Sequence, residues 1–266
     1  MTRWLPFLKS SPRVAIVRMT GAIGAGGPLS LSDQSIGPVL EAAFHKGKPD
    51  AVAIEINSPG GSPVQSSLIG GRIRRLADKR GIKVYAFVED VAASGGYWLA
   101  SAADEIWADP ASIVGSIGVI SASFGASDLL ARQGVERRVH TAGTHKSFMD
   151  PFLPLKDQDV ARLRDLLDQM HQTFIDQVKA GRGARLNGSD ATLFNGDFWL
   201  AGRAHELGLI DGIGHLKPKM QEVFGEKVSF RRYGLKKPFL RRIGADMAQD
   251  ALAAIEERAS YARYGL

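Results

Sequence analysis

Three β-rich runs, separated by helical patterns, constrain the fold of this chain more than any other feature. The runs "RVAIVRM" (13–19), "AVAIEI" (51–56) and "KVYAFV" (83–88) are nearly continuous in apolar residues, as in strands that are buried on both faces. Amphipathic helical patterns occupy 33–46 and about 63–79. Because strands alternate with helices through short connections, the sequence predicts an α/β fold of repeated βαβ units, with a mostly parallel sheet flanked by helices.

The same patterns predict further elements and the organisation of the chain. Ser62 and Pro63 are expected to begin the second helix as its N-cap and first residue. We expect an N-terminal extension (1–12), one α/β domain (13–224), and a basic strand or loop with a C-terminal helix (225–266). Other expected elements are a short helix after Ser94, a strand over 105–109, extended segments over 118–124 and 136–141, a long amphipathic helix over about 157–180, a helix, strand and turn within 201–214, and a helix over about 245–263.

The positive charge is concentrated in one segment. The net charge is +6, but residues 227–242 contain seven Lys or Arg and no Asp or Glu, which leaves 27 basic and 28 acidic residues elsewhere. This distribution argues against a protein-wide nucleic-acid surface, and no nucleic-acid partner is expected. Basic residues interleaved with apolar ones in 227–242 are typical of a solvated strand and loop, or of a peripheral contact with an anionic membrane.

Composition excludes several kinds of chemistry. The chain has no cysteine, so disulfides, thiolate metal sites and cysteine nucleophiles are excluded. The N-terminal sequence has no apolar run long enough for a signal peptide or a membrane span, and a cytoplasmic protein is therefore expected. The uncharged run 110–127 is rich in Ser, Gly and Ala, and we interpret it as buried core.

Two glycine-rich turns follow the second and third strands. They are Asn57-Ser58-Pro59-Gly60-Gly61 and Ala93-Ser94-Gly95-Gly96. In a parallel sheet, such turns meet at the edge where active sites usually form. Backbone N–H groups beside paired glycines can stabilise an oxyanion, and a serine at the start of a helix can act as a nucleophile. The alternative interpretation is that the small residues only allow a helix to pack closely on the sheet.

A nucleophilic Ser94 needs a base to take its proton. No histidine occurs between residues 95 and 139, and the next candidates lie in "HTAGTHKSFMDPF" (140–152). A lysine serves as a base only where burial or a neighbouring charge lowers its pKa. The apolar residues of 147–152 favour such desolvation. The residues alone therefore leave both His145 and Lys146 open, with a modest preference for the lysine.

Four sequence blocks together resemble a known family. They are "INSPGG", "VEDVAASGGYWLASAADEIWADPASIVGSIGVI", "TAGTHKSFMDPF" and "AGRAHELGLIDGIG", in that order. Over about residues 13–220 they resemble the signal peptide peptidase A family of serine–lysine peptidases, which has the ClpP/crotonase fold. The resemblance implies a peptidase domain over 13–224 that hydrolyses peptides, such as signal-peptide remnants, through an acyl-enzyme. It implies no metal and no cofactor.

The resemblance also assigns roles to residues. The serine of "ASGGY" is the nucleophile of the family and corresponds to Ser94. The lysine in the block after "TAG" is the general base and corresponds to Lys146, while the serine of "GSIG", here Ser116, helps to hold that lysine. The expected oxyanion donors are Gly60, Gly61 and Gly95.

The sequence departs from the family pattern at two points. Many relatives have an aromatic residue before the lysine, where this chain has His145, to which we assign no catalytic role. Many relatives also carry a membrane anchor, which is not seen here. Because single-domain relatives with one serine–lysine set tend to form rings, the resemblance implies a ring-like homo-oligomer.

Three other classes of protein are alternatives to a serine–lysine peptidase. A crotonase-type acyl-CoA enzyme would use the same paired turns but glutamates for acid–base work. A ClpP-like Ser-His-Asp peptidase would need a histidine one βα step after Ser94, where the sequence has none. A non-catalytic scaffold of the same fold would have no reason to keep both Ser94 and Lys146.

Overall fold

The computed structural model describes residues 11–24, 30–234 and 258–266. The chain divides into two compact units, residues 1–117 with 175–266 (unit 1) and residues 118–174 (unit 2). Most of the expected N-terminal extension, of the basic segment after residue 234 and of the expected C-terminal helix lies outside the described residues.

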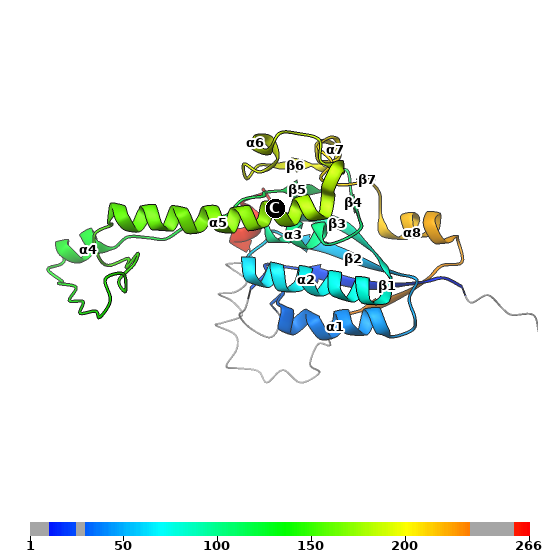
Figure 1. The fold of residues 1–266 in the computed structure, drawn as a ribbon, viewed down its shortest axis with the longest axis horizontal. Coiled ribbons are helices and arrows are strands. Elements are labelled where there is room, and N and C mark those ends of the chain that lie inside the picture. The colour runs from blue at the N-terminus through cyan, green and yellow to red at the C-terminus, as the bar shows by residue number, and fades with distance from the viewer. Residues whose placement is uncertain (1–10, 25–29, 235–257) are drawn as a thin grey trace, which may run out of the picture. The chain divides into compact units, whose positions relative to one another are not determined.

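Unit 1 is built on a mostly parallel sheet (Figure 1). Its strands are β1 (Arg13–Thr20), β2 (Ala51–Ser58), β3 (Lys83–Ala93), β4 (Glu105–Ala108), β5 (Ile113–Gly115), β6 (Phe198–Leu200), β7 (Gly212–Ile213) and β8 (Ser229–Tyr233). The order is β6-β5-β3-β2-β1-β8, and β4 pairs with both β3 and β7. All pairs are parallel except β5 with β6. This confirms the predicted α/β class and is consistent with a ClpP/crotonase-like fold.

Helices cover both faces of the central strands in unit 1. They are α1 (Asp33–His45), α2 (Pro63–Arg80), α3 (Gly95–Ser101), the C-terminal part of α5 (Asp157–Arg182), the 3₁₀ turn η1 (Gly183–Arg185), α6 (Asp190–Leu193), α7 (Ala201–Glu206) and α8 (Leu216–Phe224). Apolar residues of β1, β2 and β3 form one cluster with Leu216 and Met220 of α8. Since side chains alternate along a strand, the intervening buried residues face the opposite side, along which α1 and α2 lie side by side (Figure 1).

The helix starts and apolar faces mostly agree with the sequence-based predictions. Ser62 Oγ accepts a hydrogen bond from the N–H of Gln65 at 3.4 Å, and Pro63 is the first residue of α2. The sequence pattern places Ile36, Val39, Leu40, Ala43 and Phe44 on one face of the first helix, and all five are buried in α1. For the second helix it places Leu68, Ile73 and Leu76 on one face, which is wrong at Leu68, because that residue is 44% exposed.

Unit 2 departs from the predictions. It contains α4 (Ser127–Arg132) and the N-terminal part of α5, but no strand over 118–124 or 136–141, where extended segments were expected. Residues 120–125, within the run interpreted as core, are exposed. A segment forms a strand only where it has a ladder partner, and no described strand pairs with this run. The predicted helix over 157–180 is confirmed as α5.

A buried ion pair fixes the last turn of α5 within unit 1. Arg182 Nη1 lies 2.6 Å from Asp211 Oδ2, and only 1% of the Arg182 side chain is exposed. The N–H of Ile106 also donates to Asp211 Oδ2, at 2.7 Å, and Arg185 Nη1 donates to Oδ1 at 3.2 Å. Burial raises the pKa of Asp211, but the hydrogen bonds and the two guanidinium charges outweigh it and hold the pKa below its usual value.

Asp211→Asn is expected to lower the free energy of unfolding by about 3–5 kcal/mol, because it leaves the Arg182 charge buried without its counter-charge. Denaturant unfolding followed by circular dichroism measures this change. The stabilisation by Asp211 is present above the pKa of an unfolded aspartate and is lost as the pH falls through the lowered pKa of the folded state. The difference in unfolding free energy between wild type and Asp211→Asn should therefore shrink in acid. Glu206→Gln, in the exposed Arg203–Glu206 pair, is the control and should cost at most about 1 kcal/mol. Equal losses of unfolding free energy in Asp211→Asn and Glu206→Gln would contradict a buried ion pair at Asp211.

Candidate active site

The two glycine turns touch each other, because β2 and β3 are adjacent parallel strands that end at the same edge of the sheet. A Cβ atom placed on Gly60 would lie 2.7 Å from Ser94 Cβ and 2.8 Å from the backbone nitrogen of Gly95. A Cβ on Gly95 would lie 3.4 Å from the backbone nitrogen of Gly61. The structure therefore brings four of the predicted site residues together, at distances that only glycine allows at position 60.

Ser94 lies at the junction of β3 and α3 in a strained conformation. Its φ and ψ are 51° and −123°, a combination that costs a residue with a side chain on the order of 1–3 kcal/mol. The backbone is fixed from both sides: the N–H of Ser94 donates to the Gly115 carbonyl at 2.9 Å, and its carbonyl accepts from Trp98 at 3.0 Å. Among the described residues, the half-buried Ser94 hydroxyl has no hydrogen-bond partner. Such a turn presents a serine Oγ for attack on a substrate.

Two backbone N–H groups lie next to Ser94. Within the described part of the chain, the N–H groups of Gly61 and Gly95 have no acceptor, whereas the N–H of Gly60 donates to Ser58 Oγ at 3.3 Å. The peptide that carries Gly61 is held by Ile23, whose N–H donates to Gly60 O at 2.8 Å and whose carbonyl accepts from Ser62 at 2.7 Å. Two fixed donors beside a serine can bind a developing oxyanion.

Ser116 lies next to this arrangement. It follows Gly115, whose carbonyl accepts the hydrogen bond from the Ser94 N–H. Ser116 also has a positive φ, 53°, and its N–H donates to the Asp197 carbonyl at 2.7 Å. The Oγ of Ser116 accepts a hydrogen bond from the phenol of Tyr264 at 3.2 Å.

The C-terminal segment contributes residues to this region that sequence reasoning missed. Tyr264 Oη is also 3.4 Å from the Pro59 carbonyl, and Tyr261 Oη donates to the Asn57 carbonyl at 2.7 Å. Residues 258–262 are helical, in agreement with the predicted C-terminal helix as far as that helix is described. The only sequence signal was the spacing of the two tyrosines in "YARY", which places both on one helical face.

Lys146 and His145 belong to unit 2. Lys146 lies in a turn, where its N–H donates to the Gly143 carbonyl at 3.3 Å, and the side chains of both residues are exposed. The following Asp150 accepts hydrogen bonds from Arg137 at 2.9 Å and from the N–H of Phe152 at 2.9 Å, and these hold the pKa of Asp150 below its usual value. The desolvation expected from residues 147–152 is not provided within unit 2.

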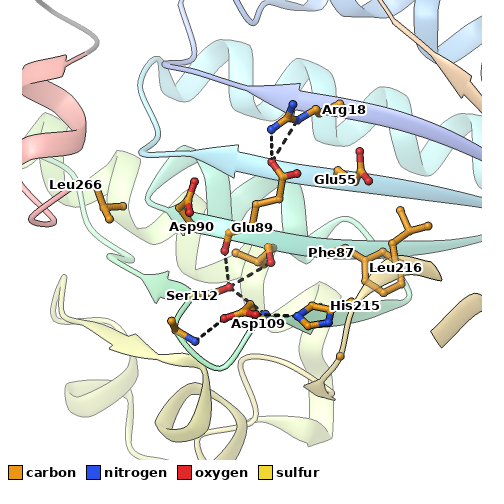
Figure 2. A pocket seen from close by; sticks show the side chains of 13 residues that line it. Arg18, Glu55, Phe87, Glu89, Asp90, Asp109, Ser112, His215, Leu216 and Leu266 are labelled. Carbon is orange, nitrogen blue, oxygen red and sulfur yellow. Dashed lines mark hydrogen bonds and ion pairs between the residues drawn. The ribbon is translucent and has the colours of Figure 1, made fainter. Parts of the chain in front are cut away.

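A polar cavity of about 580 Å³ lies on the side of the sheet that carries α8 (Figure 2). Its charges are largely paired with one another: Arg18 Nη2 is 2.7 Å from Glu89, and His215 Nε2 is 2.7 Å from Asp109. The hydrogen bond from His215 lowers the pKa of Asp109. Neither Ser94 nor the glycine turns line this cavity. Among the described residues, no group of three or more His, Asp or Glu is arranged to hold a metal ion.

The match to a protein-family profile identifies the family of this chain. The profile described as "Peptidase family S49" matches residues 77–227, more than half of the chain and a stretch that contains Ser94, Ser116 and Lys146. The chain belongs to peptidase family S49. The predicted kinship with signal peptide peptidase A, a family of serine peptidases, is thereby confirmed.

Individual relatives carry peptidase names and one other name. "Serine protease SPPA, chloroplastic" of Arabidopsis thaliana is 32% identical over 212 residues, 77% of this chain and 31% of the relative. "Probable protease SohB" of Haemophilus influenzae is 29% identical over 243 residues, 91% of this chain and 67% of the relative. "Na(+)/H(+) antiporter NhaA" of Brucella abortus is 47% identical over 272 residues, 95% of this chain.

This chain spans only 37% of the length of the Brucella relative. The name of that relative thus describes a longer polypeptide, most of which lies outside the match. Within residues 11–24, 30–234 and 258–266, no helix combines the length and the apolar composition that a membrane crossing requires.

Gly60→Ala is expected to lower the free energy of unfolding by about 1–3 kcal/mol, because a methyl group must adopt a φ of 102° against Ser94. Gly202→Ala in α7 is the matched control, since a Cβ there would meet nothing within 4 Å. It should be neutral, or stabilising by about 0.5–1 kcal/mol. Denaturant midpoints of the two variants measure the difference, and a Gly60→Ala variant as stable as wild type would refute the close approach.

Proposed function

We propose that this member of peptidase family S49 is a serine endopeptidase in which Ser94 is the nucleophile and Lys146 the general base. The observation that carries the proposal is the strained turn at Ser94, whose hydroxyl lies beside two N–H groups, all three without a partner among the residues that the structure describes. A packing role for the glycines would explain their close approach, but it would not require these groups to lack partners there. The assignment of Lys146 rests on the family resemblance of its sequence block.

The proposed reaction proceeds through an acyl-enzyme. The neutral amine of Lys146 takes the proton from Ser94 Oγ, which attacks the carbonyl carbon of the peptide bond. The N–H groups of Gly61 and Gly95 donate to the resulting oxyanion, and the bond to the leaving nitrogen breaks as Lys146 returns the proton to it. Lys146 then activates a water molecule that hydrolyses the ester. Ser116 holds the amine of Lys146 in position, and Gly60 places the Gly61 N–H.

The proposed substrates are peptides with small or apolar side chains at the cleavage point, such as remnants of signal peptides. This choice rests on the family resemblance. A crotonase-type enzyme would instead process acyl-CoA thioesters, and a scaffold would process neither.

Ser94→Ala and Lys146→Ala are each expected to reduce kcat for a fluorogenic peptide by at least about 10³-fold, since both groups take part in every proton transfer. Ser67→Ala and Lys156→Ala, at exposed positions in α2 and before α5, are controls and should keep wild-type rates. Equal background hydrolysis in all five proteins would refute the peptidase proposal, and turnover of an acyl-CoA thioester would favour the crotonase alternative.

We further propose that the chain forms a homo-oligomer through unit 2. Eight large apolar side chains of this unit are exposed: Ile120, Phe124, Leu129, Val135, Phe152, Leu155, Leu166 and Met170. Phe174, at its boundary, is its one buried hydrophobic residue. A unit of this size without a core of its own requires a partner surface, and exposed apolar groups of this number are typical of protein interfaces.

Replacing Ile120 and Phe124 by Glu together is expected to shift the protein from oligomer to monomer, because two charges would be buried in the contact. Sedimentation velocity of the full chain measures the shift. Val223→Glu, at a position in α8 that is 42% exposed, is the control and should keep the wild-type sedimentation coefficient. A monomeric wild type at micromolar concentration would exclude the oligomer.

The peripheral membrane contact of residues 227–242 stays a prediction. Of its basic residues within the described part, Arg232 is paired with Glu55 at 2.9 Å and Arg231 lies over the ring of Tyr233. Co-sedimentation with anionic vesicles at low salt tests the contact.

A further inference from the structure

We infer that Tyr264 is a positioning residue of the proposed active site, which it serves by holding the hydroxyl of Ser116. The inference rests on the proposed function, because Ser116 there has the task of holding the base. It adds a residue from outside the four sequence blocks that carry the family resemblance.

The phenol of Tyr264 connects two parts of the site. Its single hydrogen has two acceptors within reach, Ser116 Oγ at 3.2 Å and the Pro59 carbonyl at 3.4 Å. Pro59 directly precedes Gly60 and Gly61, the turn that carries one proposed oxyanion donor. Tyr264, which is 148 positions from Ser116 in the sequence, therefore lies between the oxyanion turn and the residue that is proposed to orient the base.

Packing fixes the direction of the phenol. Tyr264 is only 8% exposed and packs against Val91 and Ala93 at the end of β3, the strand that leads to Ser94. The ring of Phe198 in β6 meets it edge to face, with centroids 5.1 Å apart. A ring held on two sides has little rotational freedom, so its oxygen stays within reach of Ser116 Oγ and of the Pro59 carbonyl.

The hydrogen bond determines what the Ser116 hydroxyl can do. A serine hydroxyl has one donor hydrogen and two acceptor lone pairs. When the phenol donates to one lone pair, Ser116 keeps its own hydrogen and one lone pair for an amine. Because the backbone of Ser116 is already fixed by a positive φ and by the bond to Asp197, the phenol removes the remaining freedom, which is rotation of the side chain.

Tyr264→Phe removes the hydroxyl and keeps the packed ring. We expect kcat for a fluorogenic peptide to fall about fivefold to tenfold, as for the loss of one neutral hydrogen bond, with KM unchanged. In a Ser116→Ala background the same substitution should have a smaller effect, because the Ser116 acceptor is already gone and only the weaker contact with the Pro59 carbonyl is lost. The pH at which the rate is half-maximal should shift alike in Tyr264→Phe and Ser116→Ala.

Tyr261→Phe is the matched control, since it removes a phenol from the same segment whose acceptor is the Asn57 carbonyl. Its effect on kcat should be the same in the wild-type and Ser116→Ala backgrounds, and it should leave the pH profile unchanged. Thermal unfolding of each variant identifies any loss of fold.

The outcomes separate the two proposals. A Tyr264→Phe enzyme with the wild-type kcat and pH profile would overturn the positioning role, and so would an equal loss in both backgrounds. Either result leaves the proposed function standing as long as Ser94→Ala is inactive. Hydrolysis that does not depend on Ser94 would refute the proposed function itself.

Discussion

The close approach of the two glycine turns is the constraint on which the rest of the site depends. It follows from the pairing of β2 with β3, whose register shifts near the ends of the two strands. Ile56 pairs with Val88, but Ser58 pairs with Ala92 instead of Asp90. The shift brings Gly60 against Ser94 and the Ser58 carbonyl against Gly96, where a Cβ atom would come within 2.3 Å of that oxygen. No side chain fits there, and the backbone N–H groups themselves line the site.

The strained residues are tolerated because each is held by bonds from several elements. Ser94 is tied to β5 through Gly115, and Ser116 is tied to the turn before β6 through Asp197. The antiparallel pairing of β5 with β6 places these two acceptors at the same end of the sheet. Strain of this kind persists only where the surrounding structure fixes the residue, and it occurs frequently at functional sites.

The sequence could predict the elements that have a local pattern. The apolar runs of β1, β2 and β3, the capped start of α2 and the amphipathic face of α1 are all encoded within a few residues. The meeting of the two turns could also be predicted, because parallel strands impose it. Strand β5 was not predicted, because the three residues Ile113–Gly115 are too few to show a periodic pattern.

Contacts between distant residues could not be predicted in the same way. Nothing around Tyr264 indicates that its partner is Ser116, because a hydrogen bond of this separation is decided by the packing of the ring on β3. The amphipathic pattern of α5 places Met170 and Val178 on one face, yet Met170 is 47% exposed and Val178 is buried. A pattern identifies the apolar face of a helix, but not what covers it.

The exposure of unit 2 bears directly on the proposed chemistry. A lysine amine acts as a base only when its charged form is disfavoured, and loss of contact with water is the usual cause. Lys146 is exposed in the described chain, as are eight large apolar side chains of its unit. A surface that covered these side chains would also exclude water from the segment of Lys146, so self-association and the activation of the base would have one physical origin. Assembly would then be a condition for catalysis rather than an addition to it.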